Sequence, residues 1–233
     1  MTMDNVRIYG KAPYRALVLH GGPGAPGCAA GLCRTLEESG ISTLEHLQLG
    51  RSAEELMREI LEILDHFHTE RITVVGHSYG AWLALLFAQK HPARVRNVVI
   101  IGCGPLEEKY LSQLSQTREA RRAQGLHDTD NYCALPHASG DMLYFDKEQH
   151  ISLMEEMTAF RKSGELLRTA LSVPAKVTAI HGAYDPHPAE ALRVLEGKLP
   201  GYEMHLLERC GHDPWKETYA REEFIEILVQ EIG

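Results

Sequence analysis

The sequence has little cysteine, and no two cysteines stand at metal-binding spacing. Its 233 residues include five cysteines, and no C-x-x-C occurs, so neither a zinc ribbon nor a disulfide framework is expected. An odd number of dispersed cysteines is typical of a reducing compartment. The composition therefore predicts a cytoplasmic protein.

Positive charge is also scarce. The 24 Lys and Arg residues face 32 Asp and Glu residues, which gives a formal net charge of -8. Proteins that bind nucleic acid or anionic membranes rely on a cationic surface, so neither partner is expected. The densest apolar run, at 82–88, is far shorter than the roughly 20 residues needed to cross a bilayer. The N-terminal segment lacks the apolar core of a signal peptide.

What the sequence does contain is an alternation of short apolar runs with amphipathic stretches. Four apolar runs end in glycine or are followed by it, at 16–20, 71–76, 95–102 and 175–182, and a fifth lies at 203–207. Such runs are typical of strands buried on both faces of a parallel sheet. Helical patterns lie between or after them, at 56–67, 79–90 and 224–229. This alternation predicts an α/β fold with a mostly parallel, doubly wound sheet.

One long stretch interrupts the alternation. From residue 105 to residue 172 no strand pattern occurs, while 110–124 and 147–162 have the pattern of helices and 125–141 that of a loop. We expect an insertion between two strands of the core. The predicted division is a core of residues 1–104 and 173–233, with a short helical cap at 105–172.

The strongest chemical motif is GHSYG at 76–80, which has the pattern G-x-S-x-G. It follows an apolar strand pattern and begins an apolar helix pattern. A serine on a tight strand-to-helix turn is exposed for attack, and glycines on either side avoid clashes there. Ser78 is therefore the predicted nucleophile.

A second motif, HGGPG at 20–24, follows the first strong strand pattern. Glycines allow the backbone to approach a reacting carbonyl and direct amide groups at its oxygen. We predict the backbone amides of Gly22 and Tyr79 as the oxyanion hole. The sequence contains neither of the glycine-rich patterns that cradle phosphates.

The remaining catalytic candidates follow the last two strand patterns. Asp185 lies in HGAYDPHP at 181–188, where an acid could orient a histidine, and His212 in CGHDPW at 210–215 could serve as general base. Asp185 could instead cap a helix that begins near residue 187, and Asp141 and Asp146 of the insertion are rival acids. Among smaller features, Trp82 and Trp215 are expected to pack in the interior, with Trp215 also a candidate to line a pocket, and Asp213 is expected to cap the last helix.

These motifs, in this order, resemble those of the α/β-hydrolase superfamily. The resemblance covers most of the chain and implies a serine hydrolase with the order Ser78, Asp185, His212. The HGGPG segment is similar to that of the proline iminopeptidase-like branch. Two departures favour an esterase-like enzyme over an aminopeptidase. The segment around Ser78 reads GHSYG, where that branch has GGSWG. The segment EHLQLGRS at 45–52 stands where a D-x-R-G-x-G-type segment is expected.

The expected function is cleavage of a small-molecule ester- or amide-type acyl substrate through an acyl-enzyme, with no cofactor and no metal. A proline iminopeptidase-like aminopeptidase is the first alternative. It would need an acidic subsite for the substrate's amine, for which the insertion offers Glu107, Glu108, Asp141, Asp146, Glu155 and Glu156. The second alternative is a non-catalytic binding protein on the same fold.

Overall fold

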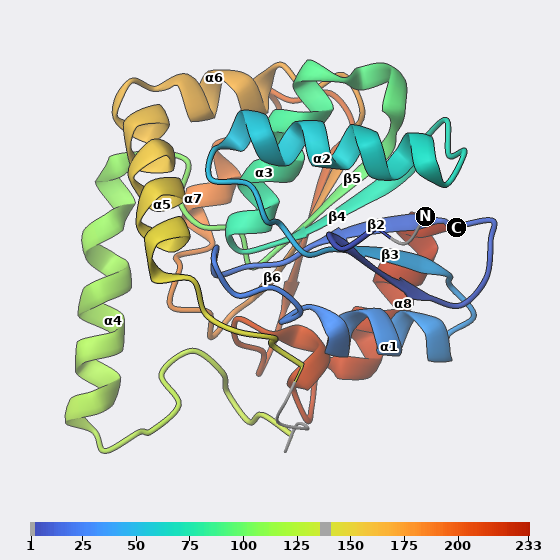
Figure 1. Ribbon diagram of the computed structural model, residues 1–233. Coiled ribbons are helices and arrows are strands. Elements are labelled where there is room, and N and C mark those ends of the chain that lie inside the picture. The colour runs from blue at the N-terminus through green and yellow to red at the C-terminus, as the bar shows by residue number, and fades with distance from the viewer. Residues whose placement is uncertain (1–2, 136–140) are drawn as a thin grey trace.

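A computed structural model describes residues 3–135 and 141–233. Its centre is a seven-stranded sheet with the order β1-β3-β2-β4-β5-β6-β7, covered by helices on both faces (Figure 1). β1 pairs with β3 antiparallel, and every other neighbouring pair is parallel. The strands are β1 (Val6–Tyr9), β2 (Ala16–Leu19), β3 (Thr43–His46), β4 (Ile72–His77), β5 (Val95–Ile101), β6 (Lys176–Gly182) and β7 (Tyr202–Leu207). The predicted mostly parallel, doubly wound α/β sheet is confirmed.

From β2 onward the helices alternate with the strands, except between β5 and β6, where the described residues form three α-helices in succession. The α-helices are α1 (Ala30–Glu38), α2 (Ala53–His66), α3 (Tyr79–Lys90), α4 (Leu111–Ala123), α5 (Lys147–Lys162), α6 (Glu165–Leu171), α7 (Glu190–Arg193) and α8 (Arg221–Ile232). Short 3-10 helices are η1 (Pro92–Arg94), η2 (Glu108–Tyr110) and η3 (Pro214–Lys216). No helix among residues 3–135 and 141–233 is both long and apolar enough to cross a membrane.

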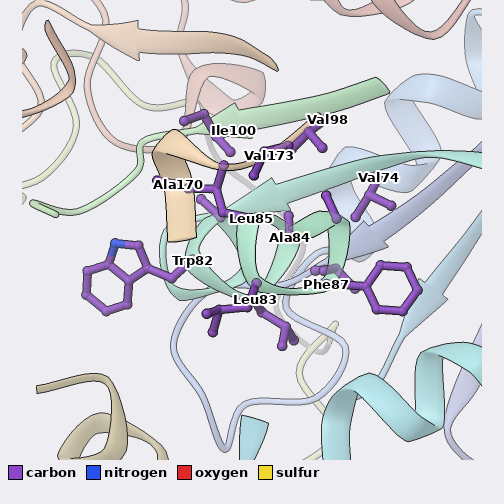
Figure 2. Close-up of a cluster of buried hydrophobic side chains, with 14 of the residues drawn as sticks. Val74, Trp82, Leu83, Ala84, Leu85, Phe87, Val98, Ile100, Ala170 and Val173 are labelled. Atoms are coloured by element: carbon purple, nitrogen blue, oxygen red, sulfur yellow. The ribbon is translucent and has the colours of Figure 1, made fainter. Parts of the chain in front are cut away.

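Two hydrophobic cores hold the helices on the sheet. The α1 and α8 side forms one core and the α2, α3 and α6 side the other. β2 and β4 are buried along their whole length, because helices cover both of their faces. α3 is apolar nearly all round, and its side chains pack on strands such as β4 through Val74 and β5 through Val98 (Figure 2). Figure 2 also shows the Trp82 ring extending away from the other labelled side chains.

The three helices between β5 and β6 form the region predicted as an insertion. α4 and α5 lie within a residue of the predicted ranges, and α6 was not predicted. α5 buries Leu153 and Met157 in the core on the α3 side, and α6 buries Leu166 and Ala170 there, whereas α4 has no buried residue. The insertion therefore rests on the core through α5 and α6. Its separate status as a cap stays a prediction.

The apolar pattern did not reveal β3, because most of the residues in this strand are polar. β3 is fully buried, yet three of its four residues, Thr43, Glu45 and His46, are polar. Tyr9 donates a hydrogen bond of 2.8 Å to Glu45, and His46 pairs with Glu59 at 2.6 Å, so these partners allow polar groups in a buried strand. The expectation that Asp213 caps the last helix is wrong, because η3 intervenes and α8 begins only at Arg221.

Candidate active site

Ser78 lies on the tight turn between β4 and α3. Its backbone φ is 53°, a left-handed conformation that residues other than glycine adopt at a cost. A side chain at Gly76 would overlap the carbonyl of Gly80, and one at Gly80 would overlap the carbonyls of Leu19 and His20. The two glycines of the motif are thus required by the close approach of β2, β4 and α3.

His212 and Asp185 come together at the same edge of the sheet. Asp185 follows β6 and His212 follows β7, and both side chains are buried. The Nδ1 of His212 donates a hydrogen bond of 2.8 Å to Oδ2 of Asp185. A Cβ at Gly102, after β5, would lie 2.9 Å from that Nδ1 and 3.1 Å from that Oδ2. Glycine is therefore needed at the end of β5 for the pair to fit, a requirement that the sequence pattern did not reveal.

The pair is electrically coupled. Burial alone would lower the pKa of His212, but the charge and the hydrogen bond of Asp185 outweigh it and raise that pKa to about 9. Burial would likewise raise the pKa of Asp185, yet His212 and hydrogen bonds from two histidines hold it well below its usual range. The carboxylate thus stays ionised and favours the protonated form of the His212 imidazole.

A second histidine, His187, shares the same carboxylate. Its backbone amide and its Nδ1 each donate a 2.8 Å hydrogen bond to Oδ1 of Asp185, and its ring lies 4.9 Å from that of His212. Burial is the main reason that the pKa of His187 is lowered. Asp185 therefore orients two imidazoles, one on each oxygen. No motif in the sequence pointed to His187, although it lies two residues from the predicted acid.

A cavity of about 340 Å³ connects the predicted site residues. Ser78, His212, Gly22 and Tyr79 all line it, whereas Asp185 lies behind His212. The structure thus brings all five predicted residues to one edge of the sheet. Their catalytic roles stay predictions.

The loop after β2 brings Gly22 to this cavity. Gly22 has a φ of 58°, and its carbonyl accepts a hydrogen bond of 3.1 Å from the amide of Ala25, which closes the turn. Tyr79 is the first residue of α3, where backbone amides have no partner inside the helix. The two amides predicted as an oxyanion hole thus belong to a glycine turn and a helix N-terminus.

Buried polar groups fix the loop that carries His212. Glu217 is fully buried, and its two carboxylate oxygens accept hydrogen bonds of 2.6–2.8 Å from the amides of Gly211, Tyr132 and Cys133. The amide of His212 donates to the carbonyl of Asp130 at 2.9 Å. Residues 130–133 of the insertion therefore hold the predicted general base in place.

His77, the residue before the predicted nucleophile, also supports this loop. Its Nε2 donates a 3.0 Å hydrogen bond to the carbonyl of His212 and lies 3.4 Å from Oδ1 of Asp213. Burial lowers its pKa to about 3, so the ring is neutral. His77, the second residue of the GHSYG motif, therefore links the turn that carries Ser78 to the loop that carries His212.

Both tryptophans are buried in the interior, as expected. Trp82 also lines the cavity, a place that was considered only for Trp215. Trp215 is not among the described residues that line it. Its ring packs edge-on against His77, with 4.7 Å between ring centres, and joins the core beside α1 and α8. Sequence alone could not decide between them, because both lie close to predicted site residues.

Two groups of described side chains have the composition of metal sites. Asp185, His187 and His212 have potential ligand atoms within 4.8 Å of one another, as do Glu203, His205 and Glu231. In the first group each imidazole Nδ1 already donates to the carboxylate. In the second, Lys176 lies 3.0 Å from each glutamate. Hydrogen bonds thus hold the first group together, and Lys176 bridges the two glutamates of the second.

The sequence from residue 16 to residue 227 matches the alpha/beta hydrolase family. The chain belongs to this family. A curated relative, the 2-hydroxymuconate semialdehyde hydrolase of Pseudomonas putida, is 24% identical over 92% of this chain and 85% of its own length. The chain spans only 58% of the length of three uncharacterized mycobacterial proteins, to which it is 23% identical.

Solved structures show the same fold. The monoacylglycerol lipase of Paleococcus ferrophilus superposes with a TM-score of 0.70 at 18% identity, covering 99% of this chain and 98% of that one. The proline iminopeptidase of Mycobacterium smegmatis gives a TM-score of 0.65 at 16% identity, with 97% and 93% covered. Such different hydrolases share the architecture, so the fold alone does not select a substrate.

Proposed function

We propose that this alpha/beta hydrolase cleaves a small ester- or amide-type acyl substrate with Ser78 as nucleophile, His212 as general base and Asp185 as the orienting acid. The observation that carries the proposal is the shared cavity. Ser78 and His212 line it together, while the far nitrogen of His212 is held by a buried carboxylate. A nucleophile, a base and an orienting acid in this arrangement are the elements of acyl transfer.

In the proposed reaction, the Ser78 oxygen attacks the substrate carbonyl and its proton passes to Nε2 of His212. The amides of Gly22 and Tyr79 donate hydrogen bonds to the oxyanion, which stabilises the tetrahedral intermediate. His212 then gives the proton to the leaving alcohol or amine, and an acyl-enzyme remains. Water repeats the sequence with the same base, and the acid product leaves Ser78 free.

We also infer that residues 105–172 cover the site and shape its pocket. Leu111 and Leu114 of α4 and His150 and Met154 of α5 line the cavity opposite the sheet edge. The core supplies the reacting groups from strand ends, and the insertion supplies most of the apolar wall. Substrate choice is thus assigned to the insertion.

The aminopeptidase alternative is less well supported. Among the described residues that line the cavity, none carries a carboxylate that could bind a substrate ammonium group. Several acids considered for that role pair elsewhere. Asp146 bonds to Arg51 at 3.0 Å, and Glu156 accepts from the amide of Ala53 at 2.7 Å. This favours an ester over an aminoacyl amide as the substrate.

Labelling with a fluorophosphonate, read by intact mass, tests the proposal. Wild type should gain one adduct and Ser78→Ala none, while Ser115→Ala, which removes an exposed hydroxyl on α4, should label like wild type. The labelled enzyme should also lose hydrolysis of a 4-nitrophenyl ester. If folded wild type neither labels nor cleaves esters, the proposal fails and a non-catalytic binding protein becomes the better interpretation. Release of proline from a prolyl 2-naphthylamide without ester cleavage would favour the aminopeptidase.

A further inference from the structure

One cation in the cavity has no counter-ion among the described residues. Arg161, in the last turn of α5, is only 5% exposed and lines the cavity. Its Nε donates a hydrogen bond of 3.0 Å to the carbonyl of Pro105. The centre of its guanidinium lies 4.6 Å from the centre of the Trp82 ring. These two contacts fix the plane of the guanidinium but use neither of its terminal nitrogens.

No carboxylate in the described part of the chain forms an ion pair with Arg161. Burial lowers the pKa of Arg161 from the ordinary value, and the charge of Glu108 acts on it in the opposite direction without a direct contact. An arginine nevertheless stays protonated in a protein. A buried cation without a partner is costly, and proteins normally pair such a group.

The other charges in the cavity are paired. Arg118 of α4 makes two hydrogen bonds of 2.7 Å to the two oxygens of Asp130, a fork-to-fork contact. His212 is paired with Asp185. Arg161 therefore leaves one positive charge in a cavity whose described lining has no acid. A single unpaired guanidinium matches a singly charged anion.

We propose that Arg161 binds a carboxylate carried by the substrate, so that the enzyme's substrates are esters with a second, free carboxyl group. The planar fork of an arginine suits a carboxylate through two parallel hydrogen bonds. Trp82 and the carbonyl of Pro105 hold that fork before the substrate arrives, which reduces the entropy lost on binding. The inference rests on the proposed function, because the ester carbonyl must lie at Ser78 while the carboxylate lies at Arg161.

Two pairs of substrates test the inference. In the first, 4-nitrophenyl hydrogen adipate carries a carboxylate on the acyl side, and its neutral control is the corresponding methyl ester. In the second, 4-acetoxybenzoate carries it on the leaving group, and methyl 4-acetoxybenzoate is the control. The quantity measured is the ratio of kcat/KM for the acid to kcat/KM for its neutral control. Wild type should favour the acid in at least one pair.

The variants Arg161→Gln and Arg161→Lys separate charge from geometry. In the favoured pair, Arg161→Gln should lower the ratio by about 10- to 100-fold, the range expected for a lost charge-assisted pair. Arg161→Lys should give an intermediate ratio, because it keeps the charge without the fork. The matched control is Lys162→Gln, the exposed neighbour on the same helix, which makes the same change in net charge and should leave the ratio within about threefold of wild type. Equal ratios in wild type and Arg161→Gln would overturn the inference.

A binding measurement distinguishes failure of the inference from failure of the proposed function. Calorimetric titration of Ser78→Ala with the acid of the favoured pair, or with both acids where no turnover is seen, should give saturable binding. The double variant Ser78→Ala, Arg161→Gln should bind at least about tenfold more weakly. Arg161-dependent binding without turnover in wild type would contradict the proposed function alone. Turnover of neutral esters with no effect of Arg161 on ratio or binding would contradict the carboxylate site alone. Melting curves identify any variant that fails to fold, and Arg161→Lys then supplies the comparison.

Discussion

Replacement of Asp185 by Asn should move the pH dependence of the reaction to lower pH. In the free enzyme the pKa of His212 is raised from 6.5 to about 9 despite burial, chiefly by the carboxylate that accepts its Nδ1 proton. At about 1.36 kcal/mol for each pH unit, this is about 3 kcal/mol in favour of the imidazolium. Because the general base must be neutral, wild-type kcat/KM should rise through the neutral range and level off only near pH 9.

Asp185→Asn removes the charge and leaves the burial that lowers the pKa of His212. The acid limb of the kcat/KM profile, the pH range over which kcat/KM rises as His212 loses its proton, should therefore move down by at least about one pH unit. The maximal kcat should fall by about 10⁴-fold, the loss seen when the acid of a serine protease triad becomes an amide. Initial rates on a neutral 4-nitrophenyl ester, taken from pH 5 to pH 10 in buffers of constant ionic strength, would measure both effects.

The matched control is Asp213→Asn. Asp213 is also buried near His212, and its charge also raises the pKa of that histidine, but its carboxylate contacts His77 and Lys216 rather than the His212 ring. Asp213→Asn should shift the acid limb of kcat/KM less than Asp185→Asn does, and it should keep most of the wild-type kcat. An acid limb at or below pH 6.5 in wild type, or one that Asp185→Asn does not move, would refute the assigned coupling.

Three further substitutions probe the turn that carries Ser78, the loop that carries His212 and the carboxylate that His212 and His187 share. Gly80→Ala should destabilise the fold by more than about 2 kcal/mol, because its methyl group meets two backbone carbonyls. The control Gly125→Ala, whose methyl group has open space, should cost about 1 kcal/mol. Denaturant unfolding would measure both changes in stability. Glu217→Gln should lower stability by about 1–3 kcal/mol and reduce kcat, because an amide cannot accept from three backbone donors, and exposed Glu222→Gln should change neither. His187→Leu should raise the acid limb of kcat/KM, because the carboxylate loses one donor and attracts the remaining imidazolium more strongly; an unmoved limb would exclude this coupling.

The parallel core was predictable because its buried strands are continuous apolar runs. β4, β5 and β6 and the helix α3 lie within a residue or two of their predicted ranges. β3 was not found by periodicity, because its polar Glu45 depends on Tyr9, a residue 36 positions away. α6 was missed because its seven residues are too few to establish a helical period.

The candidate site was predictable where a residue belongs to a local motif. Ser78 and Gly22 stand in glycine turns, and the turn geometry itself demands those glycines. Gly102 and Arg161 carry no such local signal. Gly102 matters because the side chains of His212 and Asp185 pack against it. Arg161 matters because it has no acidic partner in the part of the chain that the structure describes. Both facts arise only after distant segments meet.

Residues 130–133, in the predicted insertion, are hydrogen-bonded to the loop that carries His212, and this has a consequence for specificity. Residues 130–133 hold the loop of His212 through Glu217 and through the carbonyl of Asp130, whose side chain is in turn paired with Arg118 on α4. α4 also forms part of the cavity wall. A change in α4 that reshapes the pocket therefore also disturbs the contacts that hold His212, the proposed general base. Changes of substrate preference made through α4 should lower kcat as well as alter KM, whereas changes made through Met154 of α5, which has no part in that anchor, should act mainly on KM.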